Sequence, residues 1–286
     1  MIYNPNVVKR RKIRGYIALL LSTFAAGLGL FWLGFILFDV LRHGMSAINL
    51  DLFLEDPAPP GVPGGGLRNA FVGQLLITFF ATIIGVPIGL LAGTFIAEYA
   101  RGTRFAKIVS ILSDIMVSVP SIVVGTFIYA IMVMPVGHFN GWAGAAALAF
   151  IMIPVVLRTT EDMLSLVPWT LREAAFALGA SYFKVIKDIV YRAAITGILT
   201  GVILSIARVA GETAPLLFTS FNNSFFTLNM NEPMSSLTVT IFVYAMGPYE
   251  DWHEKAWAAA FIITFFILIV TIFSRSIIYW KYKSKS

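Results

Sequence analysis

The sequence predicts an all-α polytopic membrane protein with six transmembrane helices and both termini in the cytoplasm. The first observation behind this fold class is composition: 58% of the 286 residues are hydrophobic, 13% are charged and the mean hydropathy is +0.82. Soluble proteins carry about 25% charged residues, so a water-soluble globule is excluded, as are a disordered chain and a coiled coil. The chain has no cysteine, which excludes disulfides, thiolate metal sites and cysteine nucleophiles.

The second observation is a series of apolar runs. A helix that crosses a bilayer needs about 20 mostly apolar residues, because only a helix satisfies its own backbone in hydrocarbon. Five runs meet this length, and a shorter sixth ends at Arg158, whose aliphatic stem can reach the interface. The predicted spans are 16–38, 71–97, 109–134, 141–157, 193–219 and 256–280. The segment 237–246 is too short to span and is expected to be re-entrant or interfacial.

The third observation is the distribution of basic residues, which sets orientation. With a cytoplasmic N-terminus, all but four of the 21 Lys and Arg residues fall in cytoplasmic segments. The exceptions are Arg42, Arg68 and Lys255 in outer segments, and Arg208 within a span. The first apolar run is too long for a signal-peptide core of 7–15 residues, so we expect an uncleaved anchor.

The spans divide the chain into two units. Residues 1–68 hold the cytoplasmic N-terminus, the first span and an outer loop rich in proline and glycine. Residues 69–286 hold the other five spans and a long cytoplasmic loop, 158–192. In this loop Thr170 and Glu173 predict a capping box that opens a helix, and Gly179 predicts its left-handed end. Docking to a cytoplasmic partner and packing under the spans both remain open for this helix.

Polar residues inside the spans are costly and usually face a partner or a cavity. On the fifth span one face carries Gly197, Gly201, Ser205, Arg208, Glu212 and Pro215, and the spacing of Arg208 and Glu212 allows them to pair along the helix. A role at a transport path or gate and a buried structural ion pair are the two interpretations. On the third span a similar arc carries Asp114, Ser118, Ser121 and Gly125, beside Pro120.

A stripe of small residues marks the second span. Gly85, Gly89 and Gly93 recur every four residues, which favours close helix packing. Catalytic and nucleotide-binding motifs are absent from the sequence, which contains no zinc-protease, serine-hydrolase or Walker A pattern. We therefore expect no catalytic residues, no metal and no cofactor. If a nucleotide energises transport, another polypeptide must hydrolyse it.

Five stretches carry a resemblance to a known family. The segment Glu173-Ala174-Ala175, with Gly179 and Ile189 downstream, resembles the EAA loop of permease subunits of ABC importers. The loop ends in Tyr191-Arg192, where the family pattern has Leu-Pro. The stretches ARVAGETAPLLFT (207–219), GGGLRNAFVG (64–73), GVPIGLLAGTFIAEYA (85–100) and MNEPMSSLTVTIFVYAM (230–246) resemble the phosphate-specific branch of these permeases.

The resemblance implies a MetI-like permease fold with a cytoplasmic coupling helix, in the inner membrane of a bacterium. It implies that the helix of Glu173, Ala174, Ala175 and Gly179 couples the chain to an ATPase. From the polar faces of the spans we add the hypothesis that Ser205, Arg208, Glu212, Asp114 and Ser118 belong to the path or gate. The implied partners are a second homologous permease (PstC-type), a cytoplasmic ATPase dimer (PstB-type), a periplasmic phosphate-binding protein (PstS-type) and membrane lipid, with no nucleic acid. The implied function is a non-enzymatic permease subunit that forms half of a phosphate import pathway. The alternatives are an ABC permease for sulfate or molybdate, and a secondary transporter that works alone; a membrane enzyme is disfavoured.

Overall fold

The protein is described by a computed structural model that covers residues 5–283. The predicted cytoplasmic ends at residues 1–4 and 284–286, with Lys285, lie outside these described residues. Between residues 5 and 283 the chain is helical and contains no β-strand, apart from a single bridge between Pro57 and Gly65.

Five continuous helical segments are long and apolar enough to cross a membrane, and a bent pair of helices makes a sixth candidate. The continuous segments are α1 (Pro5–Ser46), α3 (Arg68–Thr94) with η1 (Phe95–Tyr99), α6 (Gly141–Ser165), α8 (Tyr182–Lys184) with η3 (Val185–Val190) and α9 (Tyr191–Ala210), and α12 (Glu250–Lys283). The bent pair is α4 (Arg104–Ser118) followed by α5 (Ser121–Ile128) and η2 (Tyr129–Val133). With the bent pair counted once, the number of spans equals the predicted six.

The third span is broken at Pro120, and the break interrupts the predicted arc of polar and small residues. α4 and α5 meet at an angle of 100°, because Pro120 has no N–H to donate and forces the residue before it out of the helical region. Val119 has an extended backbone, with ψ at 131°. The expected continuous arc from Asp114 to Gly125 is therefore divided between two helices that point in different directions.

The predicted limits of the fourth and fifth spans are also corrected. α6 continues past residue 157 to Ser165, and the next long helix begins at Tyr182, so the loop of 158–192 shrinks to residues 166–181. The fifth span ends at Ala210 instead of 219, because a separate short helix, α10 (Ala214–Leu217), starts with Pro215 in its first turn. Both helices extend beyond the apolar runs because charged residues next to a run do not end a helix that packs against a neighbouring helix.

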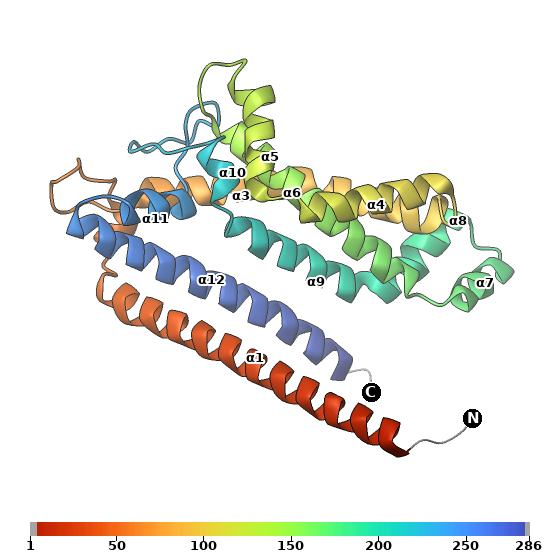
Figure 1. The fold of residues 1–286 in the computed structure, drawn as a ribbon. Helices are drawn as coiled ribbons and strands as arrows, with labels where there is room; N and C mark the ends of the chain where they lie inside the picture. Colours follow the sequence, from red (N-terminus) through yellow and green to blue (C-terminus); the bar gives the residue numbers. More distant parts are fainter. Residues whose placement is uncertain (1–4, 284–286) are drawn as a thin grey trace.

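α6 is the centre of the fold and lies between α3 and α9 (Figure 1). The small stripe of α3 faces it: a Cβ added to Gly89 would lie 2.7 Å from Val156 Cβ, and one added to Gly93 would lie 2.5 Å from the Leu157 carbonyl oxygen. Gly197 and Gly201 of α9 meet α6 from the other side, at Met163 and Thr159. Small residues on α3 and α9 let their backbones approach α6 closely. In a membrane the hydrophobic effect does not drive helices together, so this close van der Waals packing is a main source of their association.

α1 lies apart from this centre and runs beside α12 (Figure 1). Near the C-terminal end of α1, His43 stacks on Trp257 with 5.0 Å between ring centroids. The start of α1 and the end of α12 lie at the same end of the molecule as α7 (Trp169–Ala177). The short helices α2 (Asp51–Leu54), α10 and α11 (Leu237–Ala245) lie at the opposite end.

Candidate functional site

The first candidate site is the helix α7 in the loop of residues 166–181. Pro168 precedes it in the cap position and no side chain caps its first turn, so the predicted capping box of Thr170 and Glu173 is wrong: Thr170 is already inside the helix. Gly179 has a φ of +78°, the left-handed conformation that ends a helix most easily at glycine. The amides of Gly179 and Ala180 close the turn by donating to the carbonyls of Phe176 and Ala175, at 2.9 and 3.1 Å.

The two faces of α7 differ in exposure. Arg172 and Ala175 are buried against the rest of the chain. Glu173 and Ala174 point outward, and Leu178 at the end of the helix is 89% exposed. Three further large apolar residues are exposed around it: Leu166, Trp169 and Leu171. The helix therefore packs under its own spans on one side and presents an apolar surface on the other.

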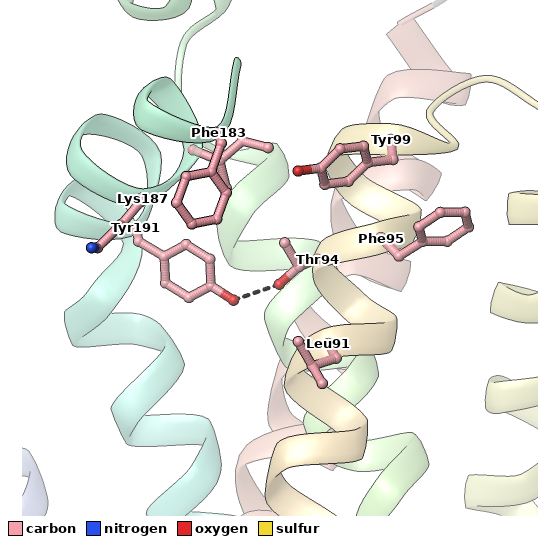
Figure 2. A pocket seen from close by; sticks show the side chains of 8 residues that line it. Leu91, Thr94, Phe95, Tyr99, Phe183, Lys187 and Tyr191 are labelled. Atoms are coloured by element: carbon pink, nitrogen blue, oxygen red, sulfur yellow. Dashed lines mark hydrogen bonds between the residues drawn. The ribbon is translucent and has the colours of Figure 1, made fainter. Parts of the chain in front are cut away.

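An apolar cavity of about 730 Å³ lies beside this loop, between the ends of the second and fifth spans that are close to it. Leu91, Thr94, Phe95 and Tyr99 line it from α3 and η1, and Phe183, Ile186, Lys187 and Tyr191 line it from α8, η3 and α9. The hydroxyls of Thr94 and Tyr191 hydrogen-bond across the gap, while Lys187 points away from that bond (Figure 2). Beside the open space, the second and fifth spans are thus joined by a hydrogen bond between two side-chain hydroxyls.

The second candidate site is the C-terminal end of α9, the end of that helix far from α7 (Figure 1). Arg208 occupies the last turn of α9 and Glu212 lies in the turn before α10, with 3.9 Å between Arg208 Nε and Glu212 Oε1. The Arg208 side chain is 47% exposed and that of Glu212 is 18% exposed. A cation is favourable at a helix C-terminus, and this loose ion pair leaves most of the guanidinium donors of Arg208 open to a further partner.

Other polar groups surround this helix end. Gln74 of α3 donates from Nε2 to the Ala210 carbonyl at 3.2 Å, and Thr238 of α11 donates to the Glu212 carbonyl at 2.9 Å. Ser205 is 1% exposed, and its hydroxyl has no hydrogen-bond partner among the described residues. We name Ser205, Arg208, Glu212, Gln74 and Thr238 the outer polar cluster.

Asp114 and Ser118 do not join this cluster. Asp114 Oδ1 lies 3.5 Å from Arg158 Nε, and Arg158 also pairs with Glu161 and Asp162 of its own helix. The Ser118 hydroxyl donates to the Ile115 carbonyl within α4. No group of three potential metal ligands occurs among residues 5–283.

The arrangement of spans around α6 matches a known family. Residues 85–280 match the model of the binding-protein-dependent transport system inner membrane component. The chain belongs to this permease family.

Two curated relatives of the permease are similar over almost its whole length. It is 52% identical over 275 residues to the phosphate transport system permease protein PstA of Pasteurella multocida, covering 96% of this chain and 97% of the relative. It is 51% identical to the PstA protein of Haemophilus influenzae, covering 93% and 94% of the two chains. Among solved structures, a chain of a bacterial ABC transporter that imports the acidic polysaccharide alginate has the same fold, with a TM-score of 0.64 and 12% identity over 96% of this chain and 97% of that one.

The permease contains site residues that the sequence analysis missed. Arg172 was counted only as a cytoplasmic basic residue, and Glu98 occurred only within the stretch 85–100 that resembles the family, yet they form an ion pair whose side chains are both 1% exposed. Gln74 and Thr238 were also overlooked. A lone amide within the apolar run FVGQLLITFF was an available signal for Gln74; for Thr238 the sequence offered none.

Proposed function

We propose that this permease is the membrane subunit of an ATP-driven importer of inorganic phosphate and forms half of the pathway. The observation that carries the proposal is the 52% identity to a phosphate permease across 96% of the chain. The separation of an exposed α7 from the outer polar cluster supports it, because an importer needs one end for energy input and one for substrate entry. The other half of the pathway would come from a second, homologous permease of the PstC type.

The remaining partners follow from the same proposal. A PstB-type ATPase dimer would bind the exposed face of α7 in the cytoplasm, and a PstS-type periplasmic protein would deliver phosphate to the opposite end. Both termini would be cytoplasmic, which the common position of α7, the start of α1 and the end of α12 supports. Residues 1–68 would add the first span to a core of residues 69–286, and Gly85, Gly89 and Gly93 would be the packing stripe of that core.

The transport path would use the outer polar cluster. A phosphate dianion that enters a low-dielectric pathway needs positive charge or oriented donors. Arg208 would meet phosphate or hold a gate through Glu212, and Ser205 would face the same path with its unpartnered hydroxyl. Asp114 and Ser118 would contribute, if at all, from the inner half of the pathway, beside Arg158.

The experiment that tests the proposed function is phosphate uptake in cells with and without this gene. Radiolabelled phosphate at micromolar concentration is compared with sulfate and molybdate. We expect phosphate uptake alone to depend on the gene and to stop when ATP is depleted. If sulfate or molybdate uptake depends on the gene and phosphate uptake does not, the proposed substrate is wrong. Uptake that survives ATP depletion would contradict the ABC mechanism and favour a secondary transporter.

Replacing Gly179 by leucine should uncouple ATP hydrolysis from transport. A side chain in the left-handed conformation costs about 1–2 kcal/mol, and a Cβ at Gly179 meets no atom within 4 Å, so the strain displaces the end of α7 without unfolding the spans. We expect phosphate uptake to fall about tenfold, within the usual range of coupling free energies, while the protein stays in the membrane and ATP hydrolysis continues.

The matched control for this prediction is Gly102→Leu. Gly102 has a φ of +76° and equally open surroundings, but it lies in the turn between η1 and α4, outside α7. The control variant should suffer the same backbone strain and keep its coupling. Equal uptake in the Gly179 variant and the wild type would refute the role of Gly179 in coupling. An equal loss of uptake in the Gly179 and Gly102 variants would mean that backbone strain alone, and not the position of Gly179 in the loop, causes the loss.

A further inference from the structure

The most deeply buried charged contact in the described chain joins the coupling helix to the second span. Arg172 of α7 and Glu98 of η1 are 74 residues apart in sequence, and both side chains are 1% exposed. Arg172 Nη2 lies 2.5 Å from Glu98 Oε1, and Arg172 Nε lies 3.2 Å from Glu98 Oε2. This is the two-pronged geometry in which a guanidinium binds a carboxylate with a fixed orientation.

The same guanidinium also binds the inner end of α6. Its Nη1 donates to the Val167 carbonyl at 2.6 Å and its Nη2 donates to the Leu164 carbonyl at 3.0 Å. These carbonyls lie at the C-terminal end of α6, where helix carbonyls lack partners and carry partial negative charge. One side chain therefore connects three elements: α7, the end of α6 and η1.

Glu98 holds the other side of the loop as well. Its carbonyl accepts a hydrogen bond from the Tyr182 hydroxyl at 2.6 Å, and the Tyr182 ring stacks on Phe176 of α7 with 5.8 Å between centroids. Glu98 lies in the π-helical segment η1, a wide-turn form that is frequent at functional sites. Glu98 thus holds both α7, through Arg172, and the start of α8, through Tyr182.

Stability alone is a weak reason for such a pair. Apolar residues of similar size often stabilise a buried position as well as an ion pair does, whereas an ion pair fixes relative orientation. Between the second and fifth spans the contacts are of another kind: a cavity separates part of their facing surfaces, and neutral hydrogen bonds join them, Thr94 with Tyr191 and Tyr182 with the Glu98 carbonyl. The ion pair therefore ties the loop to η1 and to the end of α6, while Ala175 of α7 packs against η3 of the fifth span through apolar contacts.

We infer that Glu98 and Arg172 are positioning residues that make the coupling helix one rigid unit with the inner ends of α3 and α6. Displacement of α7 by the ATPase then moves the second and fourth spans together. This inference rests on the proposed function for its energy source, and it adds the route by which motion leaves the coupling helix. Neither residue touches the substrate.

The first test measures phosphate transported per ATP hydrolysed, with the complete complex in vesicles. The variants Arg172→Met and Glu98→Gln each remove one charge of the pair. We expect complexes that assemble and hydrolyse ATP but transport roughly tenfold less phosphate per ATP, a value within the range of coupling free energies. Arg172→Lys keeps the positive charge but loses the two-pronged contact with the carboxylate. Its phosphate transported per ATP should lie between that of the wild type and that of Arg172→Met.

The matched control is Arg192→Gln, which breaks an exposed ion pair with Asp188 that spans 3.9 Å next to the same loop. It should leave the ratio of phosphate to ATP unchanged. A structural role alone would lower hydrolysis and transport together, in proportion to the amount of assembled complex. That result, or an unchanged ratio in Arg172→Met, would overturn the inference.

The second test measures rigidity directly and does not depend on the substrate. Because the chain has no cysteine, two introduced cysteines can carry a pair of spin labels without further substitutions in this chain. We place them at Thr170→Cys on α7 and Ile83→Cys on α3, both exposed positions, and measure the distance between the two labels. We expect a narrow distance distribution that nucleotide leaves unchanged, and a broad one after Arg172→Met. An equally narrow distribution in the variant would overturn the link.

A second pair of labels separates the inference from the proposed function. Thr170→Cys with Ile269→Cys, an exposed residue of α12, connects α7 to a helix outside the rigid unit. Its distance should change when nucleotide binds the ATPase. If it does not change, the proposed ATP-driven function fails, while the width of the first distribution still decides whether the ion pair fixes α7 to α3.

Discussion

Replacing Arg208 by glutamine should strongly reduce phosphate uptake while the permease remains folded in the membrane. The ion pair with Glu212 is loose, at 3.9 Å, and both side chains are partly exposed, at 47% for Arg208 and 18% for Glu212, so we expect its loss to cost about 0–1 kcal/mol of stability. A hydrogen bond from a charged donor to phosphate contributes about 1.5–3 kcal/mol. We therefore expect uptake to fall roughly 10- to 150-fold, measured with radiolabelled phosphate at equal amounts of membrane protein.

The control for this prediction is again Arg192→Gln, at the other end of α9, where the side chain is 80% exposed. It removes the same charge from the same helix and should leave uptake unchanged. Normal uptake by a fully assembled Arg208→Gln complex would exclude Arg208 from the pathway and leave the structural ion pair as its role.

A companion variant separates the two roles open to Arg208. If Arg208 binds phosphate itself, Glu212→Gln should retain most of the uptake, because the guanidinium stays in place through the position of α9. If Arg208 holds a gate through Glu212, both variants should lose uptake together. The Glu212 carbonyl already accepts from Thr238, so the backbone of this turn is held independently of the ion pair.

The features that could be predicted from the sequence are those governed by local rules. Hydropathy over about 20 residues located the spans, since the bilayer sets that length directly. The conformation of Gly179 followed from its place after a helix, because glycine alone takes a positive φ without cost. Both predictions concern the chain and its solvent, and neither needs knowledge of which helices touch.

The features that escaped prediction depend on contacts between distant segments. The burial of Arg172 exists only because η1 brings Glu98 to it and the end of α6 supplies two carbonyls. On sequence alone an arginine in a cytoplasmic loop is counted as a topology signal. The 100° bend between α4 and α5 was signalled by Pro120, but the size of a kink at proline is decided by what packs on either side of it. Gly125 of α5 lies against Pro215 of α10, a contact no periodicity indicates.

Replacing Gly93 by leucine should destabilise the whole permease. Gly93 faces α6, and a Cβ there would lie 2.5 Å from the Leu157 carbonyl oxygen and 2.7 Å from Thr160 Cβ. The carbonyl is part of the helix backbone and Thr160 is completely buried, so neither can move aside. Overpacking usually costs about 1–3 kcal/mol. A loss near 3 kcal/mol lowers the midpoint of thermal unfolding by roughly 6–12 °C for a chain of this size, which can be measured in detergent by the loss of monodisperse protein on heating.

The control for Gly93 is Gly27→Leu, in the exposed middle of α1, where a Cβ meets no atom within 4 Å. Both substitutions add the same side chain to a glycine of a membrane helix, so intrinsic helix propensity and hydrophobicity change equally. An equal shift in both variants would mean that the small stripe of α3 is not a packing surface. A large shift for Gly93 alone would mean that α3 and α6 form one tightly packed body. The ion pair holds α7 to one end of α3 and α6. Motion of α7 can reach the outer polar cluster only if α3 and α6 move together as one rigid body, because loosely packed helices would slide past each other instead.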